Sequence, residues 1–476
     1  MKNEAPRSVH FVAIGGTGMG SLAGLLHARG LRVTGSDDQL YPPMSTLLEG
    51  WGIRVHEGFR AENVAAEDPD LVVIGNAVRP DNPEAKAVLD EGLPYRSFSD
   101  ALYELAIAGK HSVVVTGTHG KTTTTSLVGS VLMRTGCDPS LLVGGHALDF
   151  GGSFREGDGE HFVVEGDEYD TAFFDKTPKF LHYHPQTLVI TSVEFDHADI
   201  YRDLDHVKDA FRTLLRQMPE DGTVIAAVGH EGVADVVRDA RCRVVGYGVG
   251  ANRSLDYAAT DLEATEEGTR FQLRRPGQPG TASLVPLYGD HNLENAVAAV
   301  AVATELGVPF EGAMAALMGF RGVRRRLEVR GEAAGVTVLD DFAHHPTAVA
   351  ATLTAVRARY PGRRIVAIFE PRTNTSRRKV FQQQYAEAFD AADRIVIREV
   401  PDTPIYSATG EVTEKFSAAQ LAADLEDREL VAEAISDVDA IVDHVVAEAA
   451  PGDVAVVMSN GAFDGIWEKL LAALEA

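Results

Sequence analysis

Short apolar runs alternate with helical stretches along the first hundred residues of the chain. The apolar runs at Val9–Ile14, Leu31–Gly35 and Asp70–Gly75 are typical of buried strands. Helical character marks the stretches between and after them, which are Gly18–Arg29, Ala85–Glu91 and Asp100–Ala108. Strands that alternate with helices predict a parallel sheet covered by helices on both faces.

A second unit of the same kind begins at His111. The apolar run Ser112–Thr116 predicts a strand, a glycine-rich turn follows it, and Thr122–Arg134 predicts a helix. Further strands are expected at Phe162–Glu165 and Leu188–Ser192. Residues 255–287 differ, because short alternating stretches surround a Pro-Gly-Gln-Pro-Gly segment. They predict a small antiparallel addition before an alanine-rich helix at 292–306.

The pattern changes again near residue 320. Residues 320–326 place a glycine and a cluster of arginines between a helix and a strand, which indicates a junction. The β/α rhythm then resumes, with strands expected at Val336–Leu339, Ile365–Phe369, Arg394–Ile397 and Val454–Met458. We therefore expect an α/β protein with three domains, which span residues 1–108, 109–325 and 326–476.

Composition supports this division and narrows the class of protein. The 476 residues correspond to three domains at about 150 residues each. Apolar residues make up 45% of the chain and charged residues 24%, which excludes a disordered chain, a collagen or a coiled coil. No apolar run reaches the roughly 18 residues of a membrane helix, and no targeting signal is recognisable. Cys137 and Cys242 fit no metal or redox spacing, so a cytoplasmic protein without a membrane segment is expected.

The chain is strongly acidic. It holds 44 basic and 70 acidic residues, for a net charge of −26, which argues against binding to nucleic acid. The excess of acid describes a solvated exterior or, alternatively, adaptation to a salty interior. Basic residues that bind anionic substrates must therefore be concentrated at the binding site.

A glycine-rich segment, Gly15–Gly20, joins the first predicted strand to the first predicted helix. Its glycines allow a tight turn and a close approach to a pyrophosphate, and the helix N-terminus favours the negative charge. Asp37 follows about 20 residues on, where its carboxylate is suited to accept hydrogen bonds from ribose hydroxyls. The pattern fits NAD, FAD or a UDP-sugar, and a tight turn without a ligand is the alternative.

A second glycine-rich turn, at residues 116–123, again links a strand to a helix. Its backbone amides are suited to cradle the phosphates of ATP, with Lys121 reaching the β- and γ-phosphates and Thr122 ligating Mg²⁺. The segment departs from the usual P-loop spelling, because its early glycine is Gly117 instead of a residue at position 115. A purely structural turn explains the Gly-Lys-Thr-Thr sequence poorly.

Acidic residues follow two further strands of the same unit. The segments 165–170 and 194–199 carry several carboxylates and His197. Because the carboxyl ends of parallel strands meet at one edge of the sheet, these side chains are well placed to hold a metal ion beside the phosphate loop. A solvated charged loop is the alternative for each segment taken alone.

Polar loops also follow three strands of the last third of the chain, at residues 340–346, 370–375 and 458–463. The edge of an open α/β sheet on which such loops lie is the edge that faces a ligand. Helix capping is an equal alternative for Asp341 and Ser459.

Seven strings occur in a fixed order along the chain: GGTGMG, GTHGKTTTTS, E-x-D-E-x-D, EFDHxD, GDHNLENAVAA, RRLE and DDFAHHPTA. Together they resemble the Mur ligases, ATP-dependent amide-forming enzymes of peptidoglycan metabolism, and the resemblance covers about residues 9–470. It implies an N-terminal Rossmann-like domain that binds UDP, a central P-loop ATPase-like domain and a C-terminal Rossmann-like domain that binds the acceptor.

The resemblance also implies roles for individual positions. It implies a UDP-sugar site of Gly15, Gly16, Thr17, Gly18, Met19, Gly20, Ser36, Asp37 and Asn76. It implies an ATP site of Gly117, Thr118, His119, Gly120, Lys121, Thr122, Thr123, Asn292, Arg326 and Asp341, with Asn292 facing adenine. The implied catalytic residues are Lys121, Glu165 and His197, and the implied Mg²⁺ ligands are Thr122, Glu165 and His197. For the incoming peptide it implies His344, Arg372, Ser459 and Asn460.

Two branches of the family differ in the acceptor that they join to UDP-N-acetylmuramate. One adds L-alanine, and the other adds the tripeptide L-alanyl-γ-D-glutamyl-meso-diaminopimelate during cell-wall recycling. Six segments look like the second branch: 41–49, 74–77, 167–176, 194–199, 370–375 and 458–461. The first branch typically has DES and PDHMD where this chain has DEY and FDHAD. Several Mur ligases also use a carbamylated lysine, for which residues 209–212 offer no counterpart and Lys208 is out of register.

The implied reaction has two steps, an acyl phosphate formed from ATP and its capture by the amine of the acceptor. The required base stays open between His344 and His345. The implied partners are small molecules only, and the chain is expected to be a monomer or a weak dimer. The rivals are the L-alanine ligase, a nicotinamide-dependent oxidoreductase that uses GGTGMG, and a nucleotide-binding module without turnover.

Overall fold

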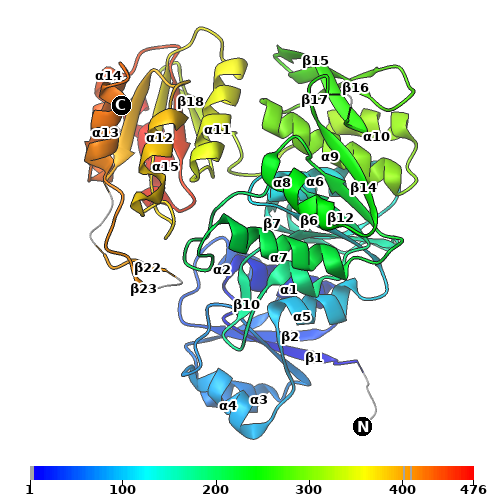
Figure 1. Ribbon diagram of the computed structural model, residues 1–476. Helices are drawn as coiled ribbons and strands as arrows, with labels where there is room; N and C mark the ends of the chain where they lie inside the picture. The colour runs from blue at the N-terminus through cyan, green and yellow to red at the C-terminus, as the bar shows by residue number, and fades with distance from the viewer. Residues whose placement is uncertain (1–4, 253, 400–402, 408–409) are drawn as a thin grey trace.

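The computed structural model describes residues 5–252, 254–399, 403–407 and 410–476, which form three α/β units in chain order (Figure 1). The N-terminal unit, in blue, lies below the central unit, in cyan to green. The C-terminal unit, in yellow to red, lies beside the upper part of the central unit. The expected α/β class is confirmed, because each unit has its own largely parallel sheet flanked by helices. None of the helices within the described ranges is long and apolar enough to span a bilayer.

The N-terminal unit has a five-stranded parallel sheet in the order β3-β2-β1-β4-β5. Its strands are β1 (Ser8–Val12), β2 (Arg32–Asp37), β3 (Arg54–Glu57), β4 (Leu71–Ile74) and β5 (Tyr95–Ser97). Its helices are α1 (Thr17–Ala28), α2 (Met44–Gly50), α3 (Ala61–Glu67), α4 (Pro83–Glu91) and α5 (Phe98–Leu102), which a π-helical turn continues at Tyr103–Ile107. The carboxyl ends of β2, β1 and β4 are neighbours, so the three predicted UDP-sugar segments share one edge of the sheet.

The central unit is built on a ten-stranded sheet in the order β17-β16-β15-β14-β13-β12-β6-β9-β7-β8. Its strands are β6 (His111–Thr116), β7 (Ser140–Ala147), β8 (Gly152–Arg155), β9 (His161–Gly166), β12 (Thr187–Ile190), β13 (Thr223–Ala226), β14 (Arg243–Val249), β15 (Tyr257–Thr265), β16 (Gly268–Arg274) and β17 (Thr281–Val285). A separate hairpin pairs β10 (Asp170–Ala172) with β11 (Asp175–Pro178). The helices of the central unit are α6 (Lys121–Arg134), α7 (Leu204–Gln217), α8 (Glu231–Val236), α9 (Asp290–Glu305) and α10 (Phe310–Ala316).

Two features of this sheet match what the sequence predicts. Strands β15, β16 and β17 pair antiparallel, as expected for residues 255–287. Strand β6 lies between β12 and β9 and is parallel to both. The glycine-rich turn after β6 and the two acidic segments after β9 and β12 are therefore direct neighbours.

The C-terminal unit has a six-stranded sheet in the order β18-β19-β25-β20-β21-β24, in which only the edge strand β18 is antiparallel to its neighbour among the described residues. Its strands are β18 (Glu328–Ala333), β19 (Val336–Asp341), β20 (Ile365–Phe369), β21 (Arg394–Arg398), β24 (Val431–Ile435) and β25 (Val454–Met458), with a small hairpin of β22 (Tyr406–Ser407) and β23 (Gly410–Glu411). Its helices are α11 (Pro346–Arg359), α12 (Gln382–Ala388), α13 (Ala418–Glu426), α14 (Val438–Glu448) and α15 (Ile466–Glu475). The predicted polar loops follow β19, β25 and β20, which are adjacent.

The helices differ in whether a side chain caps their first turn, and the helices without such a cap include α2, α3, α8, α9 and α10. Helices α4, α7, α13 and α14 begin at side-chain caps, which are Asn82, Asp203, Ser417 and Asp437. In contrast, α1 and α6 begin at Gly16 and Gly120, without a side-chain cap. The first amides of these two helices are therefore left without an intrahelical or side-chain acceptor, as an anion-binding turn requires.

The hydrophobic cores separate the C-terminal unit from the other two units, which share a core. One apolar cluster runs through the N-terminal unit into the central unit, from Leu22 and Leu25 to Phe162 and Val164. Helix α1 packs so closely on the central unit that a Cβ at Gly24 would lie 2.5 Å from the ring of Phe154. The C-terminal unit has two clusters, one on each face of its sheet.

Candidate functional site

The glycine-rich turn of the N-terminal unit is anchored from the neighbouring strand. The amide of Gly15 donates to Asp37 Oδ2 at 2.8 Å, and the amide of Gln39 donates to Asp37 Oδ1 at 3.2 Å. Gly16, Thr17 and Gly18 are exposed above this anchor. The turn thus presents backbone amides to solvent at the start of α1, while Asp37 holds its shape.

Not every residue predicted for the UDP-sugar site offers its side chain. Ser36 is fully buried and its hydroxyl donates to the carboxylate of Glu84, which is also buried. Met19 is buried in the core, and Gly20 lies against Met44, which leaves no room for a Cβ. These three residues support the turn from below, and Asn76 at the end of β4 is partly exposed beside it.

The glycine-rich turn at residues 116–123, which we call the phosphate turn, surrounds the side chain of Lys121. Gly117 and Gly120 have φ angles of +137° and +80°, which only glycine adopts freely. Lys121 Nζ donates to Gly117 O at 2.7 Å and to Glu168 Oε2 at 2.7 Å. Burial alone would lower the pKa of Lys121, but the carboxylates of Glu168 and Asp167 raise it above its ordinary value. The side chain is therefore a buried ammonium at the centre of the turn.

The rest of the turn is tied to the loop after β12. Thr118 Oγ1 accepts from the amide of Glu194 at 2.8 Å, and the amide of His119 donates to Ser192 Oγ at 2.8 Å. Thr123 is buried in the first turn of α6. The phosphate turn and the predicted metal loop thus form one rigid edge.

Acidic side chains surround Thr122 and His197. Thr122 Oγ1 donates to Glu165 Oε1 at 2.9 Å, and burial raises the pKa of Glu165. His197 Nε2 lies 3.1 Å from Glu168 Oε1. Although burial opposes the charge, Asp196 and Glu168 raise the pKa of His197 to about 9. Asp167, Glu168 and His197 offer ligand atoms that all lie within 4.8 Å of one another.

This set of donors fits a divalent cation such as Mg²⁺. Carboxylate and hydroxyl oxygens are the ligands that Mg²⁺ prefers, and Glu165, Asp167, Glu168 and Thr122 supply them. Lys121 and His197 both pair with the carboxylate of Glu168. A cation beside Thr122 would favour the neutral form of His197.

Arg326 reaches this edge from the junction with the C-terminal unit. Its Nη2 atom lies 3.5 Å from Thr122 Oγ1, and its guanidinium stacks on Phe342 at 5.0 Å. Asp341, also predicted for the nucleotide, is buried and accepts from the amides of Leu327 and Ala343. Asp341 therefore shapes the junction, and it does not cap α11, because the cap of that helix is His345.

Asn292 lies in the first turn of α9, where it is buried and its Nδ2 donates to Tyr288 O at 3.0 Å. Its neighbour Asn295 has a more direct link to the phosphate turn. Thr124 Oγ1 donates to Asn295 Oδ1 at 2.9 Å, and a Cβ at Gly120 would lie 2.6 Å from the same oxygen. Asn295 is not among the residues predicted from the sequence, and the second asparagine of DHNLEN was the signal that could have indicated it.

Two histidines and a carboxylate meet between the central and C-terminal units. Glu194 Oε2 lies 3.5 Å from His119 Nε2 and 3.9 Å from His345 Nδ1, and it accepts from Thr347 Oγ1 at 2.7 Å. Burial opposes the charge of Glu194, but the hydrogen bond and charge of His119 lower its pKa to about 2. His345 Nδ1 also accepts from the amide of Thr347, and its Nε2 faces Phe195 O at 3.2 Å. Both nitrogens of His345 are therefore occupied, which disfavours metal binding there.

The residues predicted for the incoming peptide gather at the edge of the C-terminal sheet. Ser459 Oγ donates to Glu370 Oε2 at 2.5 Å and accepts from the amide of Gly461. Arg372 is exposed over Gly461, and Asn460 Oδ1 is buried without a hydrogen-bond donor among the described residues. His344 Nδ1 lies 3.0 Å from Phe342 O, which leaves Nε2 facing Asp196 at 4.0 Å.

Glu168 and Lys208 were given no separate role in the sequence analysis, and each takes part in an ion pair with a lysine or an aspartate. Glu168 bridges Lys121 and His197, although the sequence indicated it only as one member of the acidic motif. Lys208, which is out of register with the carbamylated lysine of some Mur ligases, pairs with Asp235 at 2.9 Å.

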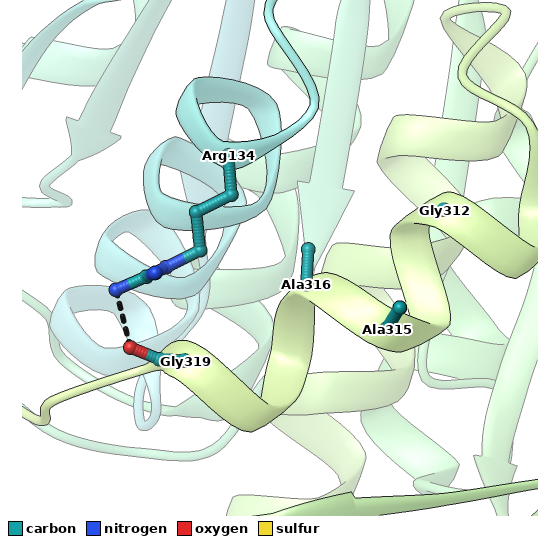
Figure 2. Close-up of a pocket in the computed structure, with 5 residues that line it drawn as sticks. All are labelled: Arg134, Gly312, Ala315, Ala316 and Gly319. Atoms are coloured by element: carbon teal, nitrogen blue, oxygen red, sulfur yellow. Dashed lines mark hydrogen bonds between the residues drawn. The ribbon is translucent and has the colours of Figure 1, made fainter.

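A cavity of about 330 Å³ lies apart from this edge, between α6 and α10 (Figure 2). Its lining residues are Arg134, Gly312, Ala315, Ala316 and Gly319. The guanidinium of Arg134 donates to Gly319 O and so ties the end of α6 to the segment after α10. The lining lacks the convergent polar groups of the edge described above.

Family models match three consecutive parts of the chain. The model described as "Mur ligase family, catalytic domain" matches residues 8–110, and the Mur ligase middle domain matches residues 115–303. The model described as "Mur ligase, glutamate ligase domain" matches residues 325–461.

Curated relatives match over almost the full chain. The UDP-N-acetylmuramate–L-alanyl-γ-D-glutamyl-meso-2,6-diaminoheptandioate ligase of Escherichia coli is 39% identical, over 98% of this chain and 98% of its own length. The ligase of the same name from Haemophilus influenzae is 36% identical, over 98% and 99%. The UDP-N-acetylmuramate–L-alanine ligase of Salinibacter ruber is 41% identical, over 85% and 83%.

Solved structures give the same result. A murein peptide ligase from Psychrobacter arcticus has a TM-score of 0.73 and 33% identity, over 98% of this chain and 99% of its own. A UDP-N-acetylmuramate–alanine ligase from Thermotoga maritima has a TM-score of 0.77 and 26% identity, over 98% of both chains. The chain therefore belongs to the Mur ligase family, whose members are ATP-dependent ligases that form amide bonds.

Proposed function

We propose that this ligase joins the tripeptide L-alanyl-γ-D-glutamyl-meso-diaminopimelate to the lactyl carboxylate of UDP-N-acetylmuramate, in peptidoglycan recycling. The main structural support for ligase chemistry is that Glu168 contacts both Lys121 and His197 beside the phosphate turn. The choice of tripeptide is supported by the two relatives of that name, which match at 36% and 39% identity over the whole chain. The L-alanine ligase is the second candidate, because relatives of that name match as well.

The three units take separate tasks in this proposal, with joints near residues 109 and 326. The exposed amides after Gly15 bind the diphosphate of the nucleotide sugar, and the phosphate turn binds ATP. The loops after β19, β20 and β25 bind the tripeptide, with Arg372 directed at one of its carboxylates.

In the first step the lactyl carboxylate attacks the γ-phosphorus of ATP, and ADP leaves. The products of this step are an acyl phosphate and ADP. Two anions meet in this step, so Lys121 and Arg326 stabilise the charge that develops on the transferred phosphoryl group. Bound Mg²⁺ supplies further charge neutralisation at the phosphates, with Thr122, Glu165 and His197 as its proposed ligands.

In the second step the α-amine of the tripeptide attacks the acyl carbon, and inorganic phosphate leaves. The amine must lose a proton in this step. Of the two candidate bases, His344 fits better, because both nitrogens of His345 are occupied while Nε2 of His344 has no hydrogen-bond partner among the described residues. Burial lowers the pKa of His344, which favours the neutral imidazole that a base requires.

We further propose that the protein acts in the cytoplasm, where ATP and nucleotide sugars are available, as a monomer or a weak dimer. Its partners in this proposal are the three small-molecule substrates.

Phosphate release tests the proposal and separates the two acceptors. The purified protein is mixed with ATP, Mg²⁺ and UDP-N-acetylmuramate, and either L-alanine or the tripeptide is added. We expect release only with the tripeptide. Release with L-alanine in place of the tripeptide would support the second candidate, and the absence of release with both would contradict ligase activity. A change in NAD(P)H absorbance would indicate the oxidoreductase instead.

A further inference from the structure

The loop that carries His197 is held by side chains of the C-terminal unit. Four of the five residues 194–198 have a partner there. Thr347 Oγ1 donates to Glu194 Oε2, and the ring of Phe195 packs edge-on against Phe381, with 6.4 Å between centroids. Asp196 faces His344 at 4.0 Å, and Ala198 is bound by two further side chains of that unit. The central unit therefore does not define the shape of this loop alone.

Two side chains of the C-terminal unit, Thr375 and Arg378, form hydrogen bonds with the backbone amide and carbonyl of Ala198, and we call these two contacts the grip. The amide of Ala198 donates to Thr375 Oγ1 at 3.1 Å, and Arg378 Nη1 donates to its carbonyl oxygen at 2.9 Å. Ala198 and Thr375 are both 2% exposed, so water does not replace these contacts easily. A guanidinium donor to a buried carbonyl is among the stronger hydrogen bonds in proteins.

The grip lies next to His197, whose backbone conformation is unfavourable for a residue with a Cβ. His197 has a φ angle of +53°, in the left-handed region that a residue with a Cβ adopts only when its surroundings impose it. On its other side, the carbonyl of His197 accepts from the amides of Ile200 and Tyr201. The peptide group between His197 and Ala198 is thus fixed from both units, with the imidazole aimed at Glu168.

We propose that Thr375 and Arg378 are positioning residues that hold His197 in its metal-binding conformation. The inference deepens the proposed function and rests on it, because it takes His197 as a ligand of the divalent cation. The C-terminal unit also carries the loops proposed for the acceptor. Docking of that unit therefore completes the metal site, and ATP turnover is coupled to the presence of the domain that delivers the amine.

The test compares substitutions at the grip with matched substitutions elsewhere in the C-terminal unit. Arg378→Met removes the donor and keeps the apolar stem, and Thr375→Val removes only the hydroxyl. The control for the arginine is Arg357→Met, since Arg357 also donates to backbone carbonyls, those of Arg363 and Ala391 inside its own unit. The control for the threonine is Thr354→Val, since Thr354 donates only along α11.

The readout is ADP formation with UDP-N-acetylmuramate and tripeptide, measured against Mg²⁺ concentration. We expect the concentration for half-maximal rate to rise by about tenfold or more in Arg378→Met and Thr375→Val, as for residues that orient metal ligands. Thr375→Ser keeps the hydroxyl, so its rate should depend on Mg²⁺ concentration in the same way as that of the unaltered protein. Binding of UDP-N-acetylmuramate and of ADP without metal should stay unchanged, because neither contacts the grip.

A parent-like Mg²⁺ dependence in the folded Thr375→Val variant would overturn the inference, since that substitution removes the acceptor for the amide of Ala198 while it keeps the size of the side chain. A lower turnover number with an unchanged Mg²⁺ dependence would overturn it as well. Failure of the proposed function is a distinct result, because the unaltered protein would then form no ADP with the tripeptide at any Mg²⁺ concentration.

Discussion

At the residue scale, the Lys121–Glu168 pair shows what a motif contains and what it omits. The Gly-Lys-Thr sequence predicted the position of Lys121 at the start of a helix, because that prediction depends only on local geometry. Glu168 lies 47 positions away, and its contact with Lys121 at 2.7 Å depends on the pairing of β6 with β9. No local pattern predicts that pairing register, so the ion partner of the lysine could not be assigned from the sequence.

Replacing Lys121 tests its role at the phosphates. Lys121→Ala should lower the turnover number by about 10³-fold, as when a single stabilising group is removed from a transition state. Binding of UDP-N-acetylmuramate should be nearly unchanged, because the N-terminal turn is a separate structure. Steady-state kinetics and calorimetry give the two values, and Lys208→Ala on α7 is the matched control. Loss of both turnover and sugar binding would contradict the division of tasks between the units.

The charge of Glu194 should stabilise the protein in a pH-dependent way. Its pKa in the folded protein is about 2, below the ordinary value of 4.5. A depressed carboxyl pKa contributes stability that is present above about pH 4.5 and is lost as the pH falls towards 2. Glu194→Gln keeps the acceptor for Thr347 but removes the charge. Because the side chain is about a third exposed, we expect a loss of about 1–2 kcal/mol at pH 7.

Urea unfolding of the parent and of Glu194→Gln at pH 7 and at pH 3.5 measures this contribution. The difference in free energy of unfolding between the two proteins should be clear at pH 7 and smaller at pH 3.5, where the carboxyl group of the unfolded chain, with its ordinary pKa of 4.5, is largely protonated. An equal difference in free energy of unfolding at both pH values would mean that the glutamine side chain disturbs packing and that the charge of Glu194 contributes nothing to stability.

At the scale of elements, the sequence predicted those whose signal is local. The helix at the phosphate turn was expected at Thr122–Arg134 and spans Lys121–Arg134, and the strand expected at Ile365–Phe369 has those bounds. Strands β7 and β8 were not expected. The apolar run of β7 is only the three residues Leu141–Val143, followed by Gly-Gly-His-Ala, and β8 begins with glycine and has no apolar run. β7 is a strand because the edge of β9 is available for pairing, and β8 in turn pairs with β7, so both depend on long-range contacts.

The same limit applies to the candidate site. The sequence predicts that certain loops face a ligand, because polar segments follow buried strands, and the structure brings these loops to shared sheet edges. The roles of single side chains within those loops depend on contacts between units. Ser36 and Asp341 illustrate this, since both belong to motifs of the ligand edge and both direct their oxygens at neighbouring protein groups.

At the scale of the molecule, the three units are not equivalent. The N-terminal and central units share one apolar cluster, whereas the clusters of the C-terminal unit are its own apart from Phe195. Apart from the contact of Phe195 with Phe381, the C-terminal unit meets the predicted metal loop mainly through polar contacts, among them hydrogen bonds to Glu194 and Ala198. Polar interfaces of this kind permit domain movement, which fits the proposal that this unit admits an acceptor and then closes.

The net charge of −26 acts on the whole molecule, and its effect depends on salt. Self-repulsion of like charges destabilises the compact state, and salt screens it as the Debye length falls from about 20 Å at low salt to about 4 Å near 0.5 M. We therefore expect the melting temperature at pH 8 to rise with NaCl over this range. The control is a titration near pH 5, where the calculated isoelectric point of about 5.0 removes most of the net charge. There the rise should nearly vanish, because no net repulsion remains to be screened. An equal rise at both pH values would assign the effect to general exclusion of salt from the surface, and a flat response at pH 8 would mean that nearby basic residues already neutralise the acidic exterior.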